Sequence, residues 1–170
     1  MTEALKVLII EDDPDIVLGC EQALQLEGIA CESVGSAEQA RRRLSRDFAG
    51  IVVSDIRLPR MDGMAFLREL VAMDPELPVV LITGHGDISM AVQAMKDGAQ
   101  DFIQKPFAPE TLVGAVRRAL ERRRLVLEVR ALRQQLQQRD SLEHRLIGRA
   151  PNMRQLRQML TGLAQSAADV

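Results

Sequence analysis

Short apolar or alternating segments recur along the chain through residue 105, and amphipathic segments separate them. Apolar runs of this length, bounded by turn residues, are typical of buried strands, and apolar positions three or four apart favour helices. Ser36 is a candidate helix cap and Gly28 a candidate helix stop. The predicted strands are 5–10, 29–34, 50–55, 77–84 and 99–105, and the predicted helices are 15–27, 36–46, 63–73, 87–97 and one that begins near 109.

The order of these elements, a strand followed by a helix repeated five times, predicts an α/β fold. Crossovers between parallel strands are right-handed and place helices against the faces of the sheet. We therefore expect a (βα)5 fold, in which a doubly wound five-stranded parallel sheet has helices on both faces. In such sheets the chemistry gathers at the carboxyl ends of the strands.

Polar residues stand at the ends of the predicted strands. Glu11 and Asp12 follow the first strand, and Asp55 ends the third. Thr83 and Lys105 end the fourth and fifth strands. Three carboxylates at one edge would repel one another and recruit a proton or a cation, and hard oxygen ligands suit Mg²⁺.

This set of side chains fits phosphoryl transfer to a carboxylate. Asp55 would act as the nucleophile, while the cation, the lysine and the hydroxyl would neutralise charge on the phosphoryl oxygens. Gly84 and Gly86 would let the backbone approach a ligand closely. The alternative is an acidic edge that only keeps the domain in solution. It is disfavoured because each of these polar side chains stands at the end of a predicted strand.

Composition narrows the classes of function. Aromatic residues make up only 2% of the chain, so stacking on nucleic-acid bases is not expected. No apolar run approaches the roughly 20 residues of a membrane span, and the N-terminus lacks the features of a signal peptide. Cys20 and Cys31 belong to no metal-ligand cluster, so we expect reduced thiols and a cytoplasmic protein.

Charge divides the chain into two regions. Positions 1–116 hold 10 basic and 19 acidic residues, whereas positions 117–157 hold 12 arginines and 4 acids. Acidic residues are interspersed among these arginines, and the arginines surround apolar positions. We therefore expect them on a solvated helix face with ion pairs, and not as a DNA-binding helix.

The basic region is part of a long predicted helix that is rich in helix formers. Its first apolar stripe would pack on the sheet and comprises Val113, Val116 and Leu120. A heptad seam follows, formed by Leu125, Val129, Leu132 and Leu136. The two stripes are out of register, which predicts a phase shift near 121–124. The seam predicts a coiled coil that supports a homodimer, and because it is short the dimer needs further contacts.

Residues 5–121 resemble the receiver domain of bacterial two-component response regulators, which has a CheY-like fold. The resemblance rests on VLIIEDDPDI, SDIRLPRMDG, LITGHGD and DFIQKPF, which occur in the family's order. It implies that Asp55 accepts a phosphoryl group from a sensor histidine kinase with the help of Mg²⁺. The implied metal ligands are Glu11, Asp12, Asp55 and the backbone carbonyl of Arg57, and the implied contacts of the phosphoryl group are Thr83 and Lys105.

The run Glu11-Asp12-Asp13 leaves the position of the acidic pair open by one residue. We place the pair at 11 and 12, because the apolar strand ends at Ile10 and the pair usually follows directly. The resemblance also implies that the Lys105–Pro106 peptide bond is cis.

The resemblance further implies a switch. Phe102 occupies the position of the aromatic switch residue, although its place in an ordinary core is an equal alternative. Phosphorylation would draw Thr83 inward and repack the face made by helix 87–97, strand 99–105 and the last helix. Met90, Val92 and Met95 would make this face a dimer surface, or else belong to the core.

The ending HRLIGRAPNMRQLRQMLTGLAQSAADV resembles the start of the ATPase domain of sigma-54-dependent activators of the NtrC class. The receiver and linker are most similar to regulators of C4-dicarboxylate transport. The implied domains are a receiver (1–121), a coiled-coil linker (122–143) and a truncated ATPase start (144–170) that we expect to be disordered or only partly helical. No phosphate-binding loop motif occurs, so we expect no ATP hydrolysis and no enzyme. In this class a receiver–linker dimer controls the downstream ATPase and thereby transcription.

Two other functions are compatible with parts of the sequence. A Mg²⁺-dependent phosphohydrolase of the haloacid-dehalogenase type could use Asp55, but it needs a second aspartate where Arg57 stands. A stand-alone receiver that acts by protein contact is disfavoured by the ATPase-like ending. Whether phosphorylation makes or breaks a dimer is left open.

Overall fold

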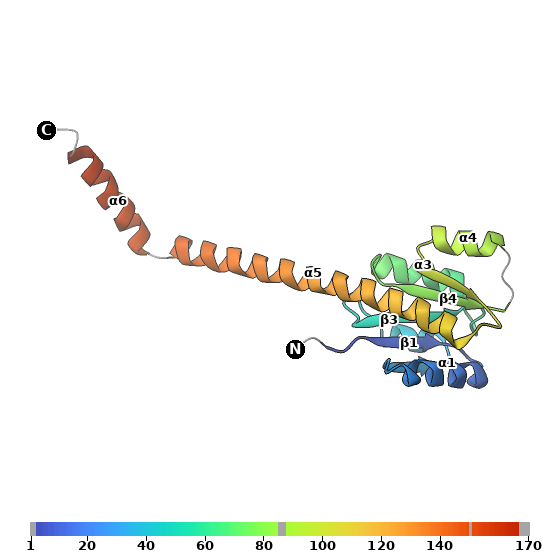
Figure 1. The fold of residues 1–170 in the computed structure, drawn as a ribbon. Helices are drawn as coiled ribbons and strands as arrows, with labels where there is room; N and C mark the ends of the chain where they lie inside the picture. The colour runs from blue at the N-terminus through green and yellow to red at the C-terminus, as the bar shows by residue number, and fades with distance from the viewer. Residues whose placement is uncertain (1–2, 85–87, 150, 167–170) are drawn as a thin grey trace. The chain divides into compact units, whose positions relative to one another are not determined.

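The computed structural model describes residues 3–84, 88–149 and 151–166, and its elements follow the predicted strand–helix order (Figure 1). The strands are β1 (Lys6–Ile10), β2 (Cys31–Val34), β3 (Gly50–Asp55), β4 (Val79–Thr83) and β5 (Asp101–Gln104). The helices are α1 (Pro14–Leu26), α2 (Ala37–Arg41), α3 (Gly63–Met73), α4 (Ile88–Lys96), α5 (Pro109–Arg149) and α6 (Pro151–Ser166).

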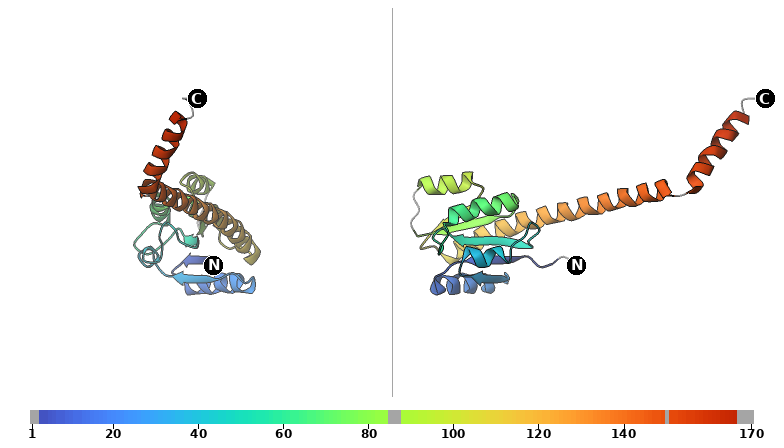
Figure 2. Two further views of the ribbon diagram at one scale, coloured as in Figure 1. Left: turned by 90° about the vertical axis from the view of Figure 1, so that its left-hand side faces the viewer. Right: turned by 180° about the vertical axis from the view of Figure 1, so that it is seen from behind.

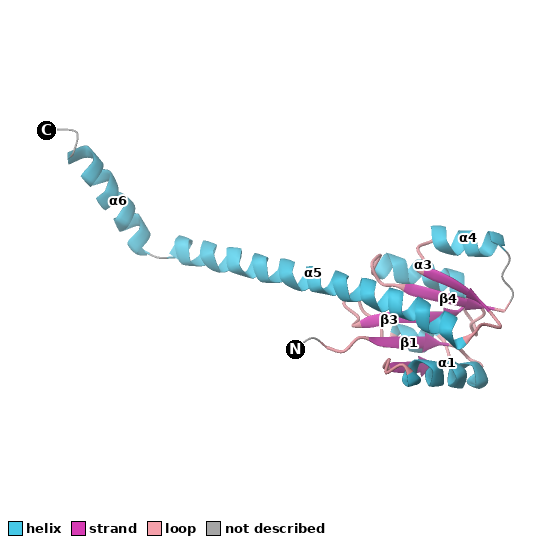
Figure 3. Ribbon diagram, viewed as in Figure 1, coloured by secondary structure: helices cyan, strands magenta, loops and turns pink. Residues whose placement is uncertain are grey.

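The strands form one parallel sheet in the order β2-β1-β3-β4-β5, which confirms the predicted doubly wound fold. Side chains alternate between its faces: Val7 and Ile9 pack with α1 and α5, whereas Leu8 and Ile10 pack with α2, α3 and α4. Helices therefore lie on both sides of the sheet (Figures 2 and 3). The strand order reverses between β1 and β3, and folds of this kind bind ligands at the carboxyl ends of such strands.

The predicted helix 36–46 is shorter in the structure. Ser36 caps it as expected, but α2 ends at Arg41 and not near Arg46. The Ala40 carbonyl accepts hydrogen bonds from the N–H groups of both the third and the fourth following residue, which tightens the chain into a turn. This turn brings Phe48 into the core just before β3, so the helical pattern cannot continue to residue 46.

Helix α5 is continuous from Pro109 to Arg149 and carries two apolar stripes. The first stripe is buried on the face of the sheet shared with α1 and comprises Leu112, Val113, Ala115, Val116 and Ala119. The second is the predicted seam, whose four apolar side chains are between 45% and 60% exposed. Arg123 is the last fully buried residue of α5 in the described part of the helix, residues 126 and 127 are half-buried, and the exposed stripe begins at residue 125, so the change between the stripes falls next to the predicted 121–124.

The chain separates into two compact units, Met1–Glu128 and Val129–Val170. Residues 144–149 and 151–166 are helical, so the prediction that the tail is disordered is wrong for these residues, whereas the alternative of a partly helical tail agrees with them. Their sequence is rich in helix formers, and Pro151 occupies the first position of α6, where proline is favourable. None of the described helices is both long and apolar enough to cross a lipid bilayer.

One arginine of the basic region contradicts the expectation of a solvated face. Arg123 is fully buried, as is its ion-pair partner Asp74, and the two are 2.8 Å apart. Other arginines of the region lie at the surface as expected; Arg117, for example, pairs with Glu27. The position of Arg123 on the receiver-facing side of α5 explains the difference, because its long side chain can reach acceptors inside the domain.

Candidate functional site

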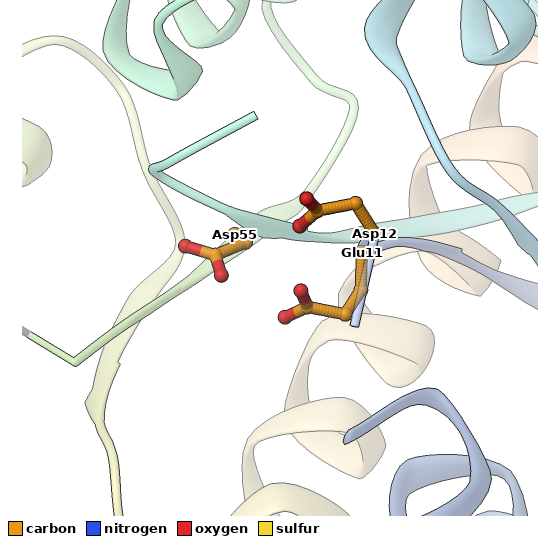
Figure 4. A group of neighbouring side chains, drawn as sticks. All are labelled: Glu11, Asp12 and Asp55. Atoms are coloured by element: carbon orange, nitrogen blue, oxygen red, sulfur yellow. The ribbon is translucent and has the colours of Figure 1, made fainter. Parts of the chain in front are cut away.

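Three carboxylates meet at the carboxyl ends of β1 and β3. One oxygen from each of Glu11, Asp12 and Asp55 lies within 4.8 Å of the other two, and the three side chains are neighbours in Figure 4. Glu11 and Asp55 are buried, whereas Asp12 is exposed. Asp13 caps α1 instead, and its side chain accepts a hydrogen bond from the Asp15 N–H at 2.9 Å. The structure thus brings residues 11 and 12, rather than 12 and 13, together with Asp55.

Lys105 neutralises two of these acids. Its Nζ donates to Glu11 Oε2 at 2.8 Å and to Asp55 Oδ2 at 2.7 Å. Burial raises the pKa of Glu11, against the opposing effects of the Lys105 bond and of a 3.1 Å bond from the Asp13 N–H. Burial alone would lower the pKa of Lys105, but its two carboxylate partners outweigh burial and raise it. Glu11 and Asp55 are therefore held largely out of water, with Lys105 as their counter-charge, while Asp12 remains exposed.

The backbone after β3 orients Asp55. The Arg57 N–H donates to Asp55 Oδ1 at 2.9 Å, a contact that the sequence pattern did not indicate. The Arg57 side chain is exposed, so its backbone is the part that contacts the aspartate. Gly63 packs directly behind this turn: its N–H donates to the Ile56 carbonyl at 2.7 Å, and a Cβ atom there would lie 2.5 Å from the Asp55 carbonyl oxygen. Only glycine allows that approach.

Thr83 reaches the same edge on the neighbouring strand. Asp55 pairs with Ile82 in the register of β3 and β4, so Thr83 lies one residue further toward the carboxyl edge. Thr83 is 1% exposed, and its carbonyl accepts a hydrogen bond from the Lys105 N–H at 2.7 Å. The residues predicted at the ends of β1, β3, β4 and β5 are therefore gathered at one edge of the sheet.

Two smaller expectations concern the loops after β4 and β5. The Lys105–Pro106 peptide bond is cis, which confirms that prediction. Gly84 is exposed, and a Cβ atom on it would meet nothing within 4 Å, so space alone does not require glycine there. Gly86 lies outside the described residues.

The predicted switch residue and dimer face are carried by β5 and α4. Phe102 is half-buried, pairs with Leu81 in the sheet and packs at the edge of the core that includes α3 and α4. Met90 packs against the same core, whereas Val92 and Met95 are 47% and 49% exposed. The apolar set on α4 is thus divided between core and surface.

Comparison with known proteins gives a family and full-length relatives. The response regulator receiver domain family matches residues 7–117. The chain is 51% identical over 170 residues to the C4-dicarboxylate transport transcriptional regulatory protein DctD of Rhizobium meliloti, which covers 100% of this chain and 37% of that protein. It is 50% identical over 165 residues to the protein of the same name from Pseudomonas aeruginosa, covering 97% of this chain and 36% of that protein. The chain thus spans little more than a third of the length of these curated relatives.

The fold is also similar to that of solved receivers. The solution structure of the beryllofluoride-activated NtrC4 receiver domain dimer matches with a TM-score of 0.65 at 30% identity, over 69% of this chain and 98% of that chain. The residues matched by the family, 7–117, include every strand-end residue gathered at the site. The chain belongs to the response regulator receiver domain family.

Proposed function

We propose that Asp55 is the residue phosphorylated by a sensor histidine kinase. A carboxylate oxygen of Asp55 attacks the phosphorus of a phosphohistidine, the P–N bond breaks, and the released imidazole takes up a proton from water. The observation that carries the proposal is the convergence of Glu11, Asp12 and Asp55 with Lys105 at the carboxyl edge of the sheet. Membership of the receiver family supports it.

The acidic cluster fits a magnesium ion. Receiver domains bind Mg²⁺ through an acidic pocket, and three carboxylate oxygens within 4.8 Å of one another are hard ligands of the kind this ion prefers. We assign Glu11, Asp12, Asp55 and the backbone carbonyl of Arg57 to hold it, with Asp12 as a direct ligand. The bound ion would supply positive charge against the phosphoryl oxygens.

Lys105 and Thr83 complete the proposed phosphoryl site. Lys105 holds Asp55 through a 2.7 Å bond, and its ammonium would contact a phosphoryl oxygen once Asp55 is modified. The Thr83 hydroxyl would donate to the same group from the end of β4. Charge neutralisation of this kind is most of what phosphoryl transfer requires of a protein.

We infer that the phosphoryl group changes the packing of α4 and β5. Movement of Thr83 toward the group would open space for Phe102 to pack inward, and Phe102 can act only by packing because it has no hydroxyl. The surface that includes Val92 and Met95 would then repack as a population shift between two states.

We further propose that this switch controls a homodimer and, through it, a longer protein. The exposed seam of α5 would join two copies of the chain, with the face formed by α4, β5 and α5 adding contact area. We interpret residues 1–121 as the receiver, 122–143 as the linker and 144–170 as the start of a sigma-54-activating ATPase domain. By similarity to its curated relatives, the full-length protein would regulate genes of C4-dicarboxylate transport. The chain itself would be a phosphoacceptor and not a separate enzyme.

The phosphoacceptor is tested by incubating the full chain with acetyl phosphate and Mg²⁺ and measuring its intact mass. We expect one added phosphoryl group in the wild type and none in Asp55→Asn. Asp12→Asn should slow the reaction and weaken its dependence on Mg²⁺, whereas Asp15→Asn, an exposed acid on α1, is the matched control. An adduct that survives Asp55→Asn would show that another residue is the acceptor.

The linker dimer is tested by sedimentation equilibrium of Leu132→Asp, which places a charge in the seam. Leu142→Asp is the matched control, because at about 100° per residue residue 142 lies about 80° to 140° around the helix from the four seam residues. We expect a clear rise in the dimer dissociation constant for Leu132→Asp only. Equal effects of the two changes would contradict a specific seam.

A further inference from the structure

Every N–H group of the buried Arg123 guanidinium has an acceptor. Its Nε–H and one terminal nitrogen donate to the Phe48 carbonyl at 3.1 and 2.9 Å, and that nitrogen also donates to the Arg46 carbonyl at 3.1 Å. The other terminal nitrogen donates to Asp74 Oδ2 at 2.8 Å and to the Glu76 carbonyl at 3.2 Å. This arrangement uses the planar fork of arginine in full, and the single ammonium of a lysine could not reproduce it.

These acceptors lie just before the two strands that carry the phosphorylation chemistry. Arg46 and Phe48 precede β3, which ends at Asp55. Asp74 caps the end of α3, and Glu76 precedes β4. This strand ends at Thr83, the proposed contact of the phosphoryl group. Asp74 is itself held, because its Oδ1 accepts the Glu76 N–H at 3.0 Å. One side chain of α5 therefore connects to the entry points of both strands.

We call Arg123 with its acceptors at residues 46, 48, 74 and 76 the anchor. Helix geometry places it at the change between the two stripes of α5. At about 100° per residue, Arg123 falls in line with the buried Leu112, Val116 and Ala119, while Leu125 and Leu132 lie about 180° to 200° away around the axis. Arg123 is thus the last fully buried side chain of this stripe, two residues before the seam begins. Together with the buried apolar stripe, Arg123 fixes the rotation of α5 about its own axis within the unit Met1–Glu128, and Leu125 at the start of the seam shares that rotation.

We propose that Arg123 is a positioning residue that couples the receiver to the linker dimer by fixing the rotation of α5. The proposal rests on the phosphorylation-controlled dimer proposed above. The guanidinium holds the helix relative to β3 and β4, so a change of these strands on phosphorylation reaches the seam as a change in its direction. A buried ion pair contributes little net stability relative to apolar residues of the same volume, and its best-attested use is to specify one register.

The test compares dimerisation with and without beryllofluoride and Mg²⁺ in the full chain. Arg123→Lys keeps the charge but loses the fork, and Asp74→Asn weakens the anchor from outside α5. Arg122→Lys is the matched control, because Arg122 is the exposed neighbour and donates to Gln100 at the surface. Sedimentation equilibrium gives the ratio of the dimer dissociation constants with and without beryllofluoride. Circular dichroism reports folding, and ¹⁹F NMR reports the uptake of beryllofluoride.

In the wild type we expect beryllofluoride to change the dimer dissociation constant by roughly 5- to 150-fold, the usual range of allosteric coupling. The change can be an increase or a decrease. In Arg123→Lys and Asp74→Asn the ratio should fall to within about twofold of one, with normal folding and normal beryllofluoride uptake, and Arg122→Lys should keep the wild-type ratio. If Arg123 had only a structural role, the variants would be less stable, but their folded molecules would keep the wild-type ratio of dissociation constants. Folded variants at 123 and 74 that keep the wild-type ratio, or variants that all fail to fold, would overturn the proposal.

The same measurements separate this inference from the function on which it rests. A wild type that takes up no beryllofluoride contradicts the phosphoacceptor site itself. A wild type that takes it up with a ratio of one contradicts the dimer switch, and with it the coupling role of Arg123. Loss of the ratio in Arg122→Lys as well would show that the dimer responds to the loss of any guanidinium group on α5, which also contradicts a specific anchor.

Discussion

Replacing Lys105 with methionine tests whether this lysine is the counter-charge that lets the acidic site fold without a metal. Lys105 Nζ lies 2.8 Å from Glu11 and 2.7 Å from Asp55, and the side chain is only 18% exposed. Methionine keeps a similar length and apolar stem but removes the charge. The three clustered carboxylates would then face one another with no cation among them.

The size of the effect follows from the geometry. The carboxylate oxygens lie within 4.8 Å of one another, and at an effective dielectric constant of about 20 two charges at that limit repel each other by about 3.5 kcal/mol. Removing one partner of a buried ion pair costs about 3–5 kcal/mol, and the exposure of Asp12 to water places this site at the lower end. We therefore expect Lys105→Met to lower the free energy of unfolding by about 3 kcal/mol near neutral pH without Mg²⁺.

The effect depends on pH and on metal. A carboxyl group whose pKa is raised in the folded state binds its proton more tightly when folded, so stability falls as pH rises from the ordinary pKa through the folded one. The pKa of Glu11 is already raised by burial, and the Lys105 bond opposes that rise. Without the lysine the pKa rises further, so the deficit of the variant should shrink when the pH is lowered toward 5. Mg²⁺ should restore more stability to the variant than to the wild type, because it replaces the missing charge.

Urea unfolding followed by circular dichroism, with and without Mg²⁺ at two pH values, measures these differences. Lys96→Met, at the exposed end of α4, is the matched control and should change the free energy of unfolding by less than about 0.5 kcal/mol. The reasoning is refuted if Lys105→Met is as stable as the wild type without Mg²⁺, or if Mg²⁺ stabilises both proteins equally.

Three further predictions follow from packing and burial. Gly63→Ala should destabilise the protein by about 1–3 kcal/mol in urea unfolding and slow the proposed phosphorylation, because the new Cβ would lie 2.5 Å from the backbone of Asp55. Gly19→Ala, in the middle of α1, is the control: its Cβ would meet no atom within 4 Å, so it should stabilise the protein slightly. Arg123→Met should lower the free energy of unfolding by about 3–5 kcal/mol and the exposed Arg122→Met by less than about 0.5 kcal/mol; equal costs would contradict the buried pair. Burial raises the pKa of the Cys20 thiol to about 11, so alkylation near pH 8 should be at least about tenfold slower in the native than in the urea-unfolded chain, and similar rates would show that the thiol is accessible.

The sheet and its site were predictable because both depend on local sequence signals. The apolar run before Asp55 predicted β3 with its bounds, and parallel pairing then required the strand ends to meet at one edge. The position of the acidic pair rested on the end of the first apolar run. A second signal supports it: an aspartate before proline is favourable at the start of a helix, and Asp13 and Pro14 occupy the cap and the first turn of α1.

Other features could not be read from residue types alone. Leu18 and Leu26 contribute to the helical pattern of α1 but are 54% and 87% exposed, because apolar residues are common on protein surfaces as well as in cores. Arg123 is the opposite case, a charged residue at a core position. Its signal was positional: it continues the buried stripe four residues after Ala119. Whether an arginine there points to solvent or inward depends on acceptors from loops distant in sequence, at residues 46–48 and 74–76.

The positions of the site and of the anchor explain how they could be coupled without a dedicated chain of side chains. β3 has 6 residues, which at about 3.3 Å per residue spans about 20 Å from the entry near the anchor to Asp55. β3 and β4 are paired and buried along their length, and a densely packed interior transmits strain. A displacement of these strands at the phosphorylated edge would therefore reach the acceptors of Arg123 at the other edge. Rotation of α5 about its axis turns every face of the helix within the unit Met1–Glu128 by the same angle, so Leu125 at the start of the seam would respond to the receiver although it lies about 200° around the helix from Arg123.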